Sequence, residues 1–141
     1  MIKMDVEGLA QARAQMAVAA QRFVDAFEAA EFAVASDVLT DLLPEVPRQT
    51  GALAASAAVT RTMPVEIVFG APYAAAVHER GSRRKWLQRP FSQASSSLAA
   101  RVAQRTALFV ESGTTLATVP AQHPTTPSSP APTRRRPQRS R

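Results

Sequence analysis

The stretch that decides the fold extends from Val46 to Trp86, and its two ends are its most distinctive parts. The first end is VPRQTGALAAS (46–56), and the second is FGAPYAAAVHERG (69–81), which KWL (85–87) follows after a short basic loop. Both parts combine turn-forming prolines and glycines with short apolar runs. Neither contains a set of side chains typical of catalysis, so the stretch predicts a compact scaffold with polar loops.

Two β-type runs lie between these ends, at residues 57–62 and 65–69. Val59 and Arg61 in the first run, and Glu66 and Val68 in the second, fit the two-residue repeat of a strand. Only Met63 and Pro64 separate the runs. The sequence therefore predicts an antiparallel hairpin with a tight connection at Pro64.

Short helices are predicted on either side of the hairpin. The hydroxyl of Thr50 is suited to cap a helix that ends near Ser56, and Gly51 supplies conformational freedom for the turn. A two-turn helix over residues 73–79 should end at Gly81, because glycine commonly follows the last turn of a helix.

A long helix is predicted from Met4 to Leu43, where Pro44 and Pro47 end it. At 1.5 Å per residue it would be roughly 55–60 Å long, which is too long for so small a domain to cover. A break near Ser36 or a neighbouring subunit would resolve this, and packing on its own domain is the alternative to contact with a second copy. Its apolar stripe contains two seven-residue repeats. The first is Leu9, Met16, Phe23 and Ala30, and the second, three positions later in the chain, is Ala12, Ala19, Ala26 and Ala33.

A second long helix is predicted over residues 90–111, ending at Gly113. The expected fold is therefore α+β, with the N-terminal and C-terminal helices packed on a small antiparallel sheet. Residues 1–113 form this domain. The apolar stripe of the second helix consists of Phe91, Ala94, Leu98, Val102, Arg105 and Phe109, helped by Leu108.

Residues 114–141 form a tail of different composition. It is rich in proline, serine, threonine and arginine, with no apolar period, so it predicts an extended chain without a fold of its own. The formal net charge of the chain is +6, and five arginines of the tail supply five of these positive charges, so residues 1–133 carry a net charge of only +1. The basic character thus belongs to the tail, through Arg134, Arg135, Arg136, Arg139 and Arg141.

Composition excludes several classes of site. The chain has no cysteine, which excludes disulfides and thiolate metal sites, and its two histidines are far apart in sequence. No run approaches the ~20 apolar residues of a membrane span, and the first residues lack the apolar core of a signal peptide. We expect no cofactor, no metal, no membrane partner, and assembly in the cytoplasm.

His78 and Glu79 are the nearest approach to an acid–base pair. Adjacent residues of a helix point about 100° apart, so the two side chains would not face one substrate, and we expect no enzyme activity. A structural or intersubunit hydrogen bond is the expectation for His78. For Tyr73 and Trp86, core packing and an interface anchor are the two alternatives.

Two basic segments remain open to several interpretations. The loop with Arg80, Arg83, Arg84 and Lys85 is either simply solvated or in contact with an acidic neighbour or DNA phosphate. The tail has no aromatic residue for base stacking. Three alternatives remain for the tail: it makes non-specific contacts with DNA phosphates, it lies as an arm on acidic protein surfaces, or it has no function.

The order of these parts resembles a family of small head–tail connector proteins of tailed bacteriophages, also called neck, minor capsid or tail-completion proteins. The resemblance covers roughly residues 5–112 and rests on order and spacing. It departs at Arg89-Pro90-Phe91, in the short loop before Lys85 and in the basic tail. The matching residues are Pro47, Thr50-Gly51, Leu53, Ser56, Gly70, Tyr73-Ala74, Val77-His78-Glu79, Gly81 and Lys85-Trp86-Leu87.

The resemblance implies a structural virion protein that forms a ring, with six or twelve copies, at the head–tail joint. Its implied partners are further copies of the chain, the head connector or stopper protein, and the tail terminator or tail tube protein, around a channel for DNA. We expect subunit or partner contacts at Thr50, Gly51, Leu53, Ser56, Tyr73, His78, Glu79, Arg83, Arg84, Lys85 and Trp86. The alternative is a small cytoplasmic DNA-binding protein that uses the basic tail.

Overall fold

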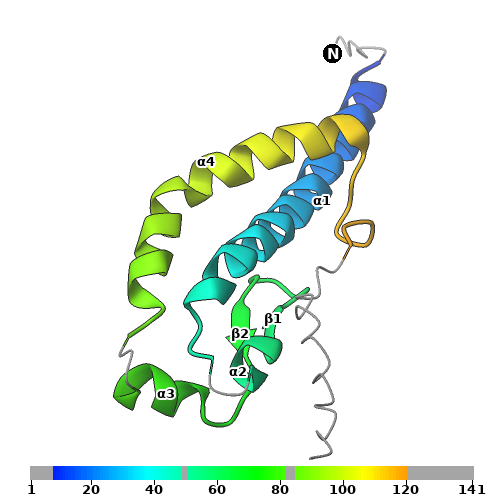
Figure 1. Ribbon diagram of the computed structural model, residues 1–141. Helices are drawn as coiled ribbons and strands as arrows, with labels where there is room; N and C mark the ends of the chain where they lie inside the picture. Colours follow the sequence, from blue (N-terminus) through cyan, green and yellow to red (C-terminus); the bar gives the residue numbers. More distant parts are fainter. Residues whose placement is uncertain (1–7, 49–50, 82–84, 121–141) are drawn as a thin grey trace, which may run out of the picture.

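The computed structural model describes residues 8–48, 51–81 and 85–120, and Figure 1 shows their arrangement. Two long helices run side by side, and a small hairpin with two short helices lies at one end of them (Figure 1). This confirms the predicted α+β class. The elements in order are α1 (Leu9–Leu42), a 3-10 turn η1 (Leu43–Glu45), α2 (Ala52–Ala55), β1 (Ala57–Val59), β2 (Ile67–Phe69), α3 (Ala74–Arg80) and α4 (Gln88–Ser112).

The helix α1 is continuous over its 34 residues. No break occurs near Ser36, whose hydroxyl donates a 2.8 Å hydrogen bond to the carbonyl oxygen of Phe32 one turn earlier. This bond lets a buried serine stay within the helix without an unpaired hydroxyl. The α-helix gives way to η1 at Leu43, and Pro44 lies in that turn, as expected of a residue that cannot continue a helix.

The hairpin is antiparallel, but its strands are shorter than predicted. Ala57 pairs with Phe69 and Val59 with Ile67. One further hydrogen bond extends the pairing: the amide of Thr60 donates to the carbonyl oxygen of Glu66 at 2.8 Å. The prediction of a tight connection at Pro64 is therefore wrong, because the chain leaves the ladder at Thr60 and returns only at Glu66.

The helix α4 packs along α1 in the opposite direction (Figure 1). Leu98 and Val102 of α4 pack on a buried row of α1 formed by Val34, Val38 and Leu42. An ion pair fastens the same helices, with Arg105 Nη2 at 2.8 Å from Asp37 Oδ2. The α4 helix ends at Gly113, which has a φ of 67° that favours glycine.

Residues 114–120 continue to pack on the domain beyond the boundary that composition placed at Gly113. Val119 is buried in a cluster with Ala29, Phe32 and Ala33 of α1. The guanidinium of Arg61 donates to the carbonyl oxygens of Leu116 and Val119, at 2.9 and 2.7 Å. Composition did not predict this return of the chain, because one valine and one leucine give no periodic pattern.

Candidate functional site

The two ends of the stretch 46–86 meet in one buried cluster. Val46 and Leu53 come from the first end and Trp86 from the second, and all three are less than a tenth exposed. Phe69 stands edge-on to Trp86, with ring centroids 5.2 Å apart. The residues that carry the family resemblance thus include the core that holds the hairpin, α2 and α3 together.

Among the expected contact residues of the first end, Leu53 is a core residue. Ser56 is half-buried, and its hydroxyl donates a 2.7 Å bond to the carbonyl oxygen of Leu53, which closes the end of α2. Gly51 precedes α2 with a φ of 76° and occupies the capping position that the sequence analysis assigned to Thr50. Thr50 itself lies outside the described residues.

The second end divides between core and surface. Trp86 follows the core-packing alternative, whereas Tyr73 is 43% exposed and is available for contact with a partner. His78 is half-buried with its ring 5.9 Å from that of Trp86, and Glu79 is exposed. The two adjacent side chains therefore lie in different surroundings, which is unsuited to joint acid–base work on one substrate.

Two buried ring nitrogens in this region have no hydrogen-bond partner among the described residues, namely His78 Nδ1 and Trp86 Nε1. The hydrogen bond expected of the His78 side chain is thus not found in the part of the chain that the structure covers. A backbone bond is present instead, in which the amide of Lys85 donates to the carbonyl oxygen of His78 at 2.8 Å.

Much of the predicted basic surface lies outside the described residues. Lys85 is exposed at the start of the approach to α4, with a φ of 53°. The other expected basic contacts fall on segments 82–84 and 121–141, which are not among the described residues. These residues are Arg83, Arg84, Arg134, Arg135, Arg136, Arg139 and Arg141.

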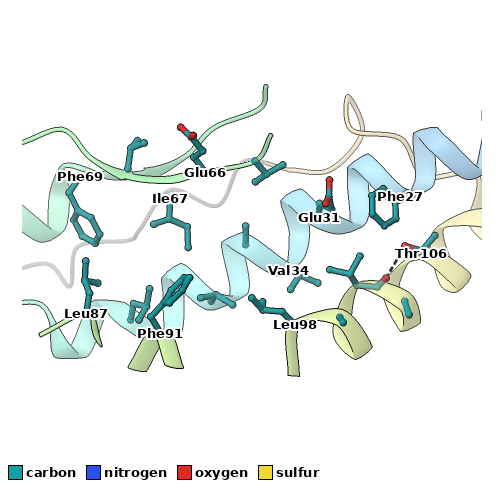
Figure 2. A pocket seen from close by; sticks show the side chains of 18 of the residues that line it. Phe27, Glu31, Val34, Glu66, Ile67, Phe69, Leu87, Phe91, Leu98 and Thr106 are labelled. Atoms are coloured by element: carbon teal, nitrogen blue, oxygen red, sulfur yellow. Dashed lines mark hydrogen bonds between the residues drawn. The ribbon is translucent and has the colours of Figure 1, made fainter. Parts of the chain in front are cut away.

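An apolar groove lies between α1, β2 and α4, which the sequence did not predict. It has a volume of about 1600 Å³ (Figure 2). Figure 2 shows Phe91 and Leu87 at one end and Phe27 and Thr106 at the other, with Ile67 and Leu98 on facing sides. Several large apolar side chains remain open on it: Phe23, Phe27, Val68, Phe91 and Val110.

The N-terminal half of α1 is a second open apolar surface. Every residue from Leu9 to Val24 is exposed, whereas the stripe is buried from Ala26 onward. Met16 is 72% exposed, and Phe23 is 55% exposed. Large apolar side chains repeated along an uncovered helix face form an exposed apolar patch of a kind that is rare on soluble monomers. The seven-residue repeat was the sequence feature that pointed to it.

No group of three or more histidine, aspartate or glutamate side chains in the described residues is placed to hold a metal ion. None of the described helices is long and apolar enough to cross a membrane.

No family model, no curated protein and no solved structure matches the chain.

Proposed function

We propose that this protein is a structural part of a tailed-bacteriophage virion that forms a ring at the joint between head and tail. The order of motifs along residues 47–87 supports this proposal. So does the α+β fold, because a long leading helix, a hairpin and a closing helix are the arrangement that the resemblance implies.

One observation carries the proposal, namely the uncovered apolar half of α1. In a protein that works as a monomer, the exposed side chains of Leu9, Met16 and Phe23 would add nothing to the stability of its own domain. Subunits of a ring place such a surface against a neighbour. The apolar groove on the same chain supplies a second surface of this kind.

The mechanism proposed is geometric. Repeated subunit contacts close a ring that matches the head connector or stopper on one side and the tail terminator or tail tube on the other, and leaves a channel for DNA. Exposed Tyr73, Glu79 and Lys85 lie close to one another in sequence at one end of the domain, and we assign them to contacts with these neighbouring rings. Residues 121–141 would reach further if extended, since a chain of that length spans on the order of 70 Å.

The experiment is a mass measurement followed by localisation. Analytical ultracentrifugation of the full chain, alone and with the head connector or tail tube of the same phage, should give a ring of fixed copy number. Immunogold labelling of intact virions should then mark the neck. Absence of a ring under all three conditions, or labelling elsewhere on the virion, would overturn the proposal.

A DNA-binding protein with a basic tail is the second candidate. The five arginines of the tail favour it, but the remaining chain carries only +1. This candidate predicts DNA affinity that falls steeply with salt and disappears when residues 121–141 are removed. A chain that binds DNA in this way and forms no ring would replace the connector proposal.

A further inference from the structure

We propose that the apolar groove between α1, β2 and α4 receives the N-terminal half of α1, residues 9–24, from a second copy of this chain. The inference deepens the proposed function by naming the contact between subunits, and it rests on that function only for the closing of these contacts into a ring.

The first step is the character of residues 9–24. Leu9, Met16 and Phe23 form the main row of the seven-residue repeat, and Ala12 and Ala19 form the row behind it. All are exposed here, while the continuation of both rows at Ala26 and Ala30 is fully buried. Small residues between large ones let a partner backbone approach closely, as in helix pairs that interdigitate. The exposed half of α1 therefore has the same apolar repeat as the half that is already covered.

The second step is the fit of length. The groove follows α1 from Phe23 to Leu42, which at 1.5 Å per residue is roughly 28 Å. The uncovered segment from Leu9 to Val24 is roughly 23 Å long by the same measure. A helix of this length matches the groove, and its apolar row would cover Phe27, Phe91 and Val110, which are all more than a third exposed.

The third step is charge. The segment 9–24 carries Arg13 and Arg22 and no acidic residue. These two lie on opposite flanks of the apolar row, at the positions that set partner choice in helix pairs. Along the groove the charged side chains are Glu31, Glu66 and Glu111, with Lys85 at one end. In the described part of the chain none of the three carboxylates forms an ion pair.

The occupant cannot be this same copy of the helix, because α1 continues unbroken from Leu9 into the wall of its own groove. The tail is also unsuited, since residues 121–141 contain no leucine, isoleucine, valine, methionine or aromatic residue. An apolar groove gains free energy only from apolar surface. A second copy offers that surface together with the complementary charge.

The resulting contact is head-to-tail, because helix and groove are different surfaces of one chain that share only Phe23. Each copy would donate its helix to one neighbour and receive a helix from another. Such contacts produce a closed ring when the rotation between copies divides a full turn, and an open filament otherwise.

Four alanine-to-glutamate variants of the full chain test the proposal. Ala19→Glu places a carboxylate in the alanine row of the apolar stripe. Ala17→Glu places one about 200° around the same exposed helix. Ala103→Glu fills the groove from α4, and Ala100→Glu is its control, since Ala100 is exposed and does not line the groove. All four positions are exposed, and circular dichroism would verify that each variant folds.

Sedimentation velocity would measure self-association. The wild type, Ala17→Glu and Ala100→Glu should associate alike. Ala19→Glu and Ala103→Glu should each raise the dissociation constant at least about tenfold, because a carboxylate would be buried against apolar side chains. Mixing these two variants restores one intact contact, between the helix of Ala103→Glu and the groove of Ala19→Glu, so the mixture should form a dimer and nothing larger.

Several results would overturn the inference. A wild-type chain that stays monomeric at its highest soluble concentration would do so, as would an Ala103→Glu variant that associates like the wild type. A mixture that stays monomeric would also do so. Rings that persist in both Ala19→Glu and Ala103→Glu would end this inference and leave the connector proposal standing. Dimers or open filaments that follow the predicted variant pattern would keep the inference and remove the ring.

Discussion

Trp86 stands edge-on to Phe69, with ring centroids 5.2 Å apart and ring planes at 89°. The contact joins the last residue of β2 to the segment that leads into α4. Val46 and Leu53, which precede the hairpin in the sequence, belong to the same buried cluster. The Phe69–Trp86 pair thereby fixes the second end of the stretch 46–86, and Val46 and Leu53 join the first end to it.

Replacing Trp86 with alanine should therefore lower the free energy of unfolding by about 3–5 kcal/mol, since a large buried ring leaves a cavity. Tyr73→Ala is the control, because Tyr73 is 43% exposed and should cost much less. Urea denaturation followed by circular dichroism would compare them. Equal losses would show that Trp86 is not the centre of this cluster.

Arg61→Lys should loosen the segment that follows α4. The guanidinium of Arg61 donates to the carbonyl oxygens of Leu116 and Val119, and its central carbon lies 4.5 Å from the ring centre of Phe32. A lysine cannot reproduce the two-pronged geometry, so a loss of about 1–3 kcal/mol is expected. Hydrogen exchange at residues 115–119 should rise.

The control for Arg61→Lys is Arg48→Lys, because Arg48 is exposed and takes part in no ion pair within the described residues. Unchanged hydrogen exchange at residues 115–119 in Arg61→Lys would contradict the role of the guanidinium in holding this segment.

Two truncated chains should separate the packed part of the C-terminal region from the remainder. A chain that ends at Pro120 keeps Val119 in the cluster with Ala29 and Phe32, so its melting temperature should match that of the full chain. A chain that ends at Gly113 exposes this cluster and should melt several degrees lower, because about 1 kcal/mol moves the midpoint by roughly 2–8 °C. Equal melting temperatures for both would show that the segment after Gly113 adds no stability.

Gly81→Ala should destabilise the end of α3. A Cβ atom at Gly81 would press on the carbonyl oxygen of Val77, so the backbone would have to shift, at a cost of about 1–3 kcal/mol. Gly113→Asn is the matched control. Nothing lies near a Cβ atom at Gly113, and asparagine tolerates its left-handed backbone. Thermal melts should rank Gly81→Ala well below Gly113→Asn, and the reverse order would contradict the steric argument.

Local features of the chain could be predicted because local physics sets them. The seven-residue repeat predicted α1, the prolines after Leu42 predicted its end, and the glycine at position 113 predicted the end of α4. The turn at Pro64 was predicted too tight, because the strength of pairing at residues 60–66 depends on the packing of the strands against α1. The short return of Val119 to the core had no periodic pattern to reveal it.

The sequence by itself determined which segments are helical, where a hairpin falls and that the basic charge belongs to the tail, because these depend on neighbouring residues and on composition. Only the tertiary structure decided which apolar residues are covered. It buried Trp86 and left Tyr73 exposed, and it covered the stripe of α1 from Ala26 onward while leaving Leu9 to Val24 bare. The reason is that α4 and the hairpin are shorter than α1, so their apolar faces cover only its C-terminal half.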